Sequence, residues 1–223
     1  MLQPFTIKFL KDLKKNNTKE WFDKNRKVYE AAKNDFAETI QSVIDGFGKK
    51  DEEIAVLNAK NCMFRINRDV RFSKNKAPYK CNMGTSINKG GRSTMTTAGY
   101  YFHLEPGNSF LGGGLWMPEP SVLKKIRQEV DYNFEEFKKI TGNKKFTGLY
   151  KDLDHSAEMK LVRPPKGYEA DNPAIEYIKL KSFVAIAPVT DAELTDKNLI
   201  KKIINSFEIL QPLVAFINRT TED

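Results

Sequence analysis

The sequence contains few of the side chains that build disulfide frameworks and metal sites. Two cysteines, Cys62 and Cys81, and two histidines occur in 223 residues. Two cysteines are too few for a disulfide framework, and they lack the spacing of a zinc site. Two reduced thiols are the simplest interpretation and are typical of a cytoplasmic protein. We therefore expect no metal, no cofactor and a cytoplasmic location.

Long apolar runs and low-complexity segments are also missing. No stretch of about 18 apolar residues occurs, which excludes a membrane-spanning helix. The apolar positions of residues 1–15 are broken by Lys8 and lack the small-residue cleavage site of a signal peptide. Neither a repeat nor a linker divides the chain. The sequence thus predicts a single domain over residues 1–223 and no membrane partner.

The common catalytic motifs do not occur either. The triplet Gly112-Gly113-Gly114 is not followed by the Gly-Lys-Ser/Thr or G-x-G-x-x-G pattern of a nucleotide-binding loop. It can admit a ligand, or make room for an aromatic side chain of the protein itself. No nucleophile elbow, zinc-protease helix or catalytic Cys/His pattern is present. Composition therefore leaves open whether the protein is an enzyme.

Acidic residues are scarce in one stretch, residues 60–92, and basic residues gather there. The stretch holds nine Lys or Arg residues and one acid, Asp69, so its formal charge is 9 − 1 = +8, equal to the net charge of the whole protein. The rest of the chain therefore sums to zero. A concentrated positive field attracts anions more strongly than the same charge spread evenly. The stretch predicts an anion-binding surface.

Apolar spacing predicts helices at both ends of the chain and strands between them. Apolar residues recur every three or four positions over residues 7–13, 18–47 and 199–217, and Thr190 with Glu193 forms a capping-box pair. We expect the second of these helices to begin after Asn17 or Thr18, with Glu20 closing a capping box on Asn17. It should run unbroken to about Gly46. Further helices are expected at 118–130, 133–140 and 171–180.

In the middle of the chain the period changes from 3.6 to 2. Strands are expected at 63–67, 81–88, 99–105, 109–116, 158–162 and 183–187, with an irregular loop at 67–78. The turn at residues 106–108 marks the clearest hairpin. Strands flanked by helices in runs favour an α+β fold. We expect a central antiparallel sheet with a long N-terminal helix, middle helices and a long C-terminal helix packed around it.

The hairpin carries the one plausible acid/base pair. Alternation places Tyr101, His103 and Glu105 on one face of its first strand. His103 and Glu105 are the catalytic candidates, because both groups can transfer protons from the same face. The alternative is a structural histidine. A metal site would need a third ligand, and the second histidine, His155, lies far along the chain.

The basic stretch supplies the candidates for binding. Guanidinium groups at intervals of three suit a phosphate or carboxylate, while an acid such as Asp69 would orient an arginine. Tyr79 can stack on a base or sugar ring or bury its ring against the hairpin, and Trp116 can be a sugar platform or a core residue. The predicted ligand-binding residues are Arg65, Arg68, Arg71, Lys76, Tyr79, Lys80 and Trp116.

Several separated motifs cover nearly the whole chain. The longest is Phe64-Arg65-x-x-Arg68-Asp69-x-Arg71-Phe72-Ser73-Lys74-x-Lys76-x-Pro78-Tyr79-Lys80. The others are Asn16-Asn17-x-Lys19-Glu20-Trp21-Phe22, Tyr101-x-His103-Leu104-Glu105-Pro106-Gly107, Gly112-Gly113-Gly114 and Pro165-Lys166-Gly167-Tyr168. In these motifs the sequence resembles an uncharacterised family of conserved hypothetical proteins with a domain of unknown function. That family often has an acid where this chain has Asn75, and the resemblance implies no biochemical activity.

Three functions are compatible with these features. The first is binding of a small anionic or phosphorylated ligand, with possible catalysis, in a basic cleft between the 65–80 loop and the 99–116 hairpin. The second is nucleic-acid binding, which the sequence pI of about 9.3 and the aromatic residues near the charge favour. The third is a structural protein whose arginines form internal ion pairs. We favour the first, because the basic block is compact and contains no known nucleic-acid motif.

Overall fold

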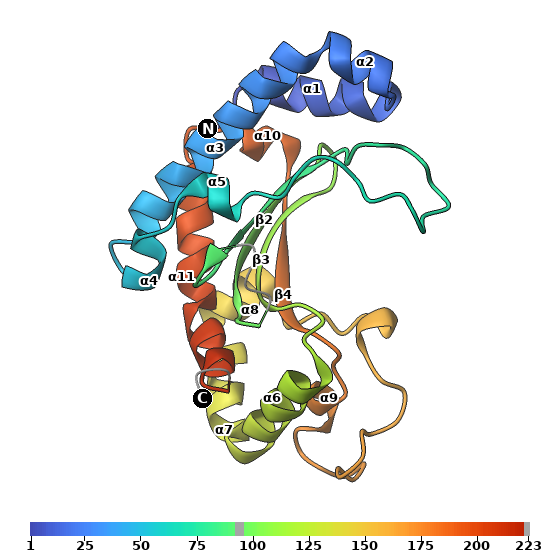
Figure 1. Ribbon diagram of the computed structural model, residues 1–223. Coiled ribbons are helices and arrows are strands. Elements are labelled where there is room, and N and C mark those ends of the chain that lie inside the picture. Colours follow the sequence, from blue (N-terminus) through green and yellow to red (C-terminus); the bar gives the residue numbers. More distant parts are fainter. Residues whose placement is uncertain (92–95, 221–223) are drawn as a thin grey trace. The chain divides into compact units, whose positions relative to one another are not determined.

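The computed structural model describes residues 1–91 and 96–220, and its strands form one antiparallel sheet in the order β1-β2-β3-β4 (Figure 1). The strands are β1 Met83–Ile87, β2 Gly99–Leu104, β3 Ser109–Leu115 and β4 Phe183–Val189. The helices are α1 Pro4–Lys15, α2 Lys19–Lys24, α3 Arg26–Phe47, α4 Glu52–Ala55, α5 Ala59–Cys62, α6 Pro120–Tyr132, α7 Phe134–Thr141, α8 Lys144–Tyr150, α9 Ile175–Ile178, α10 Asp191–Leu194 and α11 Leu199–Asn218. The predicted α+β class is confirmed. Arg92, counted above in the basic stretch, lies outside the described residues.

The chain divides into two compact units. The first contains Met1–Arg92, Tyr101–Leu111 and Pro188–Asn205, and the second contains Ser93–Tyr100, Gly112–Ala187 and Ser206–Asp223. Strands β2, β3 and β4 and helix α11 each contribute residues to both units. The single domain expected from the sequence stays a prediction. No helix in the described parts of the chain is long and apolar enough to cross a membrane.

In the first unit, the expected helix over residues 18–47 is interrupted at Asn25. That residue has φ −103° and ψ 14°, and its side-chain amide donates to the carbonyl of Trp21 at 2.9 Å, which separates α2 from α3. The Thr18 hydroxyl accepts from the Trp21 amide and caps α2. The capping box expected between Asn17 and Glu20 is therefore wrong, because the cap lies one residue later and position N3 is a tryptophan. The box at Thr190 and Glu193 is present and begins α10.

The strand expected at 63–67 is also wrong. Only two isolated bridges form there, Met63 with Thr85 and Asn67 with Tyr79. Single backbone hydrogen bonds add to them, from Lys80 to the Ile66 carbonyl and from Arg68 to the Pro78 carbonyl. Residues 63–68 and 78–85 therefore form an irregular hairpin, which we call the basic hairpin. Its tip, residues 69–77, is the irregular loop that the sequence predicted, and we call it the tip loop.

The second unit packs helices α6 to α9 around aromatic rings. The ring of Phe137 meets that of Tyr177 edge-on at 4.9 Å and lies 5.3 Å from that of Phe216. Helix α8 was not predicted, and α9 is shorter than the helix expected at 171–180. The strand expected at 158–162 is wrong: residues 157–159 form a 3-10 turn, followed by one bridge between Lys160 and Leu180.

The glycine triplet of β3 makes room for neighbouring parts of the protein. A Cβ at Gly112 would lie 2.7 Å from the Ala185 carbonyl oxygen, and one at Gly113 would lie 2.9 Å from Leu210. Gly114 has φ +118°, and a Cβ there would collide with the carbonyl oxygen of Phe183. The atoms nearest to these glycines are therefore backbone atoms and aliphatic side chains, not the aromatic side chain that was one of the two alternatives.

Candidate functional site

Three polar side chains lie in a row on one face of β2. Tyr101, His103 and Glu105 are half-buried, whereas Phe102 and Leu104 on the opposite face are fully buried. Because side chains alternate along a strand, the apolar face anchors β2 in the core and holds the polar row in register. The sequence prediction for this strand is confirmed. The site thus stands on a regular element.

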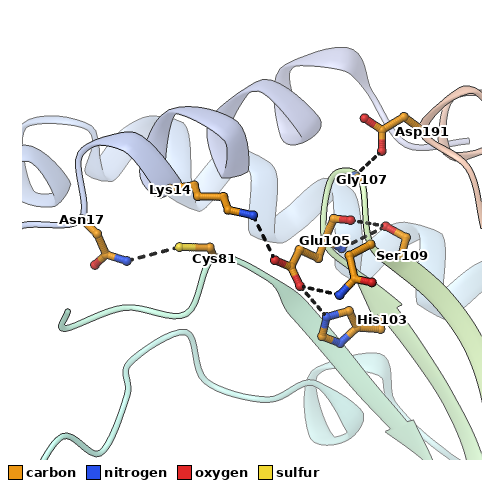
Figure 2. Close-up of polar contacts among 9 residues, drawn as sticks. Lys14, Asn17, Cys81, His103, Glu105, Gly107, Ser109 and Asp191 are labelled. Carbon is orange, nitrogen blue, oxygen red and sulfur yellow. Dashed lines mark hydrogen bonds and ion pairs between the residues drawn. The ribbon is translucent and has the colours of Figure 1, made fainter. Parts of the chain in front are cut away.

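Hydrogen bonds connect the three side chains in series. The Tyr101 hydroxyl lies 3.2 Å from His103 Nδ1. On the other side of the ring, His103 Nε2 lies 3.4 Å from Glu105 Oε2, a contact drawn in Figure 2. A carboxylate only accepts, so a neutral imidazole satisfies both contacts when Nε2–H donates to Glu105 and Nδ1 accepts from Tyr101. The row is therefore a hydrogen-bonded series of a phenol, an imidazole and a carboxylate.

The surroundings set the protonation state of each member. Burial lowers the pKa of His103, Glu105 partly offsets that effect, and nearby Lys80 lowers the pKa further. Burial alone would raise the pKa of Glu105, but hydrogen bonds from Asn108 and His103 and the charge of Lys14 bring it below its usual value. Burial raises the pKa of Tyr101 to about 12. At neutral pH the row therefore holds a protonated phenol, a neutral imidazole and a carboxylate.

Aromatic packing and the adjacent turn fix the geometry. The Phe110 ring stacks on the His103 ring at 4.6 Å and 10°. Gly84 leaves the space that the Tyr101 hydroxyl occupies, since a Cβ there would collide with it. At the turn, the Ser109 hydroxyl accepts from the Glu105 amide at 2.9 Å and donates to its carbonyl at 2.8 Å. These contacts restrict the rotation of the groups in the row.

The same turn is attached to α10 and α1. The Gly107 amide donates to Asp191 Oδ1 at 2.7 Å (Figure 2). Lys11 pairs with the other carboxylate oxygen of Asp191 at 2.9 Å. From α1, Lys14 reaches Glu105 Oε1 at 3.5 Å. The acid end of the row is therefore held by elements distant in sequence.

Two cations of the basic hairpin complete the site. Burial lowers the pKa of Lys80, and the charge of Arg65 lowers it further. The Lys80 ammonium lies 5.6 Å from the centre of the Phe64 ring. Within residues 1–91 and 96–220, neither the Lys80 ammonium nor the Arg65 guanidinium forms a hydrogen bond or ion pair. Two like charges therefore lie close together beside the neutral histidine.

Three other basic side chains of the hairpin have partners within it. Arg68 donates to the Ala77 carbonyl at 3.1 Å and to the Ser73 hydroxyl at 3.3 Å. Arg71 binds both carboxylate oxygens of Asp69, at 3.0 and 2.7 Å. Lys76 donates to the Val70 carbonyl at 3.1 Å. The three predicted arginines thus have three different sets of neighbours.

Tyr79 belongs to a clasp between the basic hairpin and α2. Asn17 accepts from the Tyr79 amide at 3.1 Å and donates to its carbonyl at 2.9 Å, and the Phe22 ring stacks on the Tyr79 ring at 3.9 Å. The same Asn17 amide contacts Cys81 Sγ (Figure 2). The Tyr79 ring is buried, so it has no part in the function proposed below.

The structure thus places Lys80 and Arg65 close together beside the row that contains His103 and Glu105. The side chains of Arg68, Arg71 and Lys76 instead form hydrogen bonds within the hairpin. Trp116 follows β3 in the second unit and is 50% exposed, and its ligand-binding role stays a prediction. Sequence reasoning missed Tyr101 as a site residue, although its position two residues before His103 on the same face was the signal. Lys14 and Phe110 had no such signal, because their contacts depend on the fold.

Metal binding is not indicated by the site. Across the two described segments of the chain, no group of three or more His, Cys, Asp or Glu side chains is arranged to hold a metal ion. His155 pairs with Asp152 at 3.3 Å in the second unit.

The fold and the site define an α+β protein that has a Tyr–His–Glu row beside a basic hairpin. A family model described as "Conserved hypothetical protein (DUF2461)" matches residues 5–216, nearly the whole chain, and the protein belongs to this family. No curated protein and no solved structure matches the chain.

Proposed function

We propose that the first unit binds a small anionic ligand between the basic hairpin and the outer face of β2, and that the Tyr101–His103–Glu105 row transfers a proton at that ligand. A phosphate or carboxylate of the ligand would pair with Lys80 and Arg65. The observation that carries this proposal is the placement of these two cations together beside a neutral histidine, with no ion pair from either of them to a carboxylate of the described residues.

Electrostatics favours an anion at this position. The charge of Arg65 lowers the pKa of Lys80, so the two cations repel each other in the empty site, and an anion between them removes that repulsion. Partial burial of Lys80 strengthens the effect, because charges interact more strongly away from bulk water. Lys14 is already committed to Glu105, so the carboxylate of the row does not neutralise the pair.

The row provides the chemistry. When the Tyr101 oxygen takes a proton from the ligand, the phenol proton passes in the same step to His103 Nδ1, so no free phenolate has to form. The imidazolium formed would be stabilised by the Glu105 carboxylate. A proton could travel the same path in reverse to a basic atom of the ligand. The reaction class is thus proton transfer through Tyr101, and general acid–base catalysis of this kind contributes about a hundredfold to ten-thousandfold.

A thermal-shift screen tests the binding step with inorganic phosphate, sugar phosphates and dicarboxylates. We expect a phosphate-bearing ligand to raise the Tm of the wild type and of a Lys74→Gln control, which removes an exposed lysine of the same hairpin. The Lys80→Met variant should lose the ligand response while its ligand-free Tm is unchanged or higher, because the repulsion with Arg65 is removed. A ligand at a hundred times its Kd stabilises by about 2.7 kcal/mol. Equal responses in all three proteins would refute the proposal.

A further inference from the structure

The tip loop exposes an aromatic ring that the function proposed above does not use. Phe72 is 96% exposed, the largest value among the exposed large hydrophobic side chains of the described chain. A single exposed apolar residue is ordinary on a protein surface. The surroundings of this ring are what indicate a role.

Charged side chains lie on the same loop as the ring. The Arg71 guanidinium lies 5.8 Å from the Phe72 ring centre, and Lys74 and Lys76 are exposed on the same loop. With Asp69 as the one acid, residues 69–77 carry a formal charge of 3 − 1 = +2. The loop therefore offers an aromatic face and positive charge within nine consecutive residues.

The loop is held in shape at its base although its tip is exposed. Arg68 joins the two sides of the loop through the Ala77 carbonyl and the Ser73 hydroxyl. Next to Arg68, the β-bridge between Asn67 and Tyr79 joins the two sides of the hairpin at the base of the loop. Figure 1 shows the loop (teal) reaching away from α5. A preorganised loop loses less entropy when it binds a partner.

A second aromatic–cation pair lies on the same hairpin. The Phe64 ring is 40% exposed and has the Lys80 ammonium 5.6 Å from its centre. Exposed rings that accept stacked bases, next to cations that neutralise phosphates, are the elements with which proteins bind single-stranded nucleic acid. The hairpin presents no helix to a duplex major groove. Only one ring at the tip could enter a bilayer, with polar Ser73 and Lys74 following it, so a membrane surface fits less well.

We propose that the basic hairpin binds single-stranded nucleic acid, with Phe72 stacking on a base and with Lys74 and Lys76 of the tip loop contacting phosphates. The tip loop carries this inference, and it holds whether or not the small-ligand site at β2 is occupied. Stacking is sequence-tolerant because every base has a π-face, so binding should show little sequence preference.

Fluorescence anisotropy with labelled twelve-residue oligo-dT and oligo-rU tests the proposal in the full chain. We expect Phe72→Ala to weaken binding about tenfold at every salt concentration, the usual effect of losing one stacking ring. Phe72→Tyr, which keeps an aromatic face, should bind as the wild type does. Tyr132→Ala is the matched control, since it removes a 73% exposed ring from the second unit. Phe72 and Tyr132 are both exposed enough that the three variants should fold.

A second arm measures the salt dependence. The slope of log K against log salt should fall in magnitude by about 0.7 in Lys74→Gln if that lysine contacts one phosphate, and should not change in Phe72→Ala. Lys80→Met separates the two proposals: it abolishes the response to small phosphates if the β2 site binds them, whereas the Phe72 effect on oligonucleotides persists.

Three results would overturn the inference. One is undetectable oligonucleotide binding by the wild type at low salt. Another is equal affinity of the wild type and Phe72→Ala. The third is sedimentation with vesicles of one-third phosphatidylserine that depends on Phe72, combined with oligonucleotide binding that does not, which would assign the loop to a membrane surface.

Discussion

The clasp between Asn17 and Tyr79 gives the sharpest prediction for stability. The Asn17→Ala variant removes the acceptor of the Tyr79 amide and the donor to its carbonyl, at 3.1 and 2.9 Å, and leaves both backbone groups in a partly buried place. An unsatisfied buried group costs about 1–3 kcal/mol. Water can reach part of this site, so the lower end applies to each group. We therefore expect a loss of about 2 kcal/mol in the free energy of unfolding.

Urea denaturation followed by tryptophan fluorescence measures this loss. Asn16→Ala is the matched control, because that neighbouring amide is exposed and only donates to a carbonyl at the end of α1. It should cost about 0.5 kcal/mol or less. Hydrogen exchange gives a local measurement, since the Tyr79 amide should lose protection in Asn17→Ala alone. If the two variants lose the same free energy, or if Tyr79 stays protected, the clasp does not hold the hairpin.

Three further outcomes are expected. Lys80→Met should raise the pKa of His103, measured by NMR titration of the imidazole protons, because the lysine charge lowers it. Gly114→Ala should cost about 2–4 kcal/mol in thermal unfolding through its positive φ and the collision with β4, whereas Gly148→Ala on α8, where nothing lies within 4 Å, should be neutral or slightly stabilising. The pKa of Glu193 is about 2, lowered by the hydrogen bond from a lysine of α11, so its contribution is complete above about pH 5 and is lost as the pH falls towards 2. The variant Glu193→Gln should therefore show less acid destabilisation between pH 5 and 2 than the wild type.

The β2–β3 hairpin and its polar row could be predicted, because the sequence pattern that indicates them lies within a few neighbouring residues. A period of two fixes which side chains share a face, and the Pro106–Asn108 turn fixes where the chain reverses. The break between α2 and α3 could not be predicted in the same way, because the apolar stripe continues through it. The Asn25 side-chain amide donates to the Trp21 carbonyl in the previous turn, where the helix is interrupted. The spacing of apolar residues does not indicate this hydrogen bond.

Convergence of the three arginines was expected from their spacing, and spacing is informative only within regular structure. Arg65, Arg68 and Arg71 lie in an irregular hairpin, where an interval of three defines no common face. Each side chain therefore takes the partners that its own backbone position offers. The cations that meet at the β2 face, Arg65 and Lys80, come from opposite sides of the hairpin, and only the fold brings them together.

The basic side chains of the hairpin thus fall into two groups, those with partners inside the hairpin and those without. Arg68 and the Asp69–Arg71 pair keep the loop in shape, so these charges are already satisfied by neighbours. Lys80 and Arg65 remain without such partners in the described chain, at the end of the hairpin nearest His103. Two adjacent cations that form no ion pair within the described residues repel each other, and this repulsion is destabilising until an anion arrives. This pair of cations, and not the total charge of the stretch, is therefore the feature that argues for a ligand.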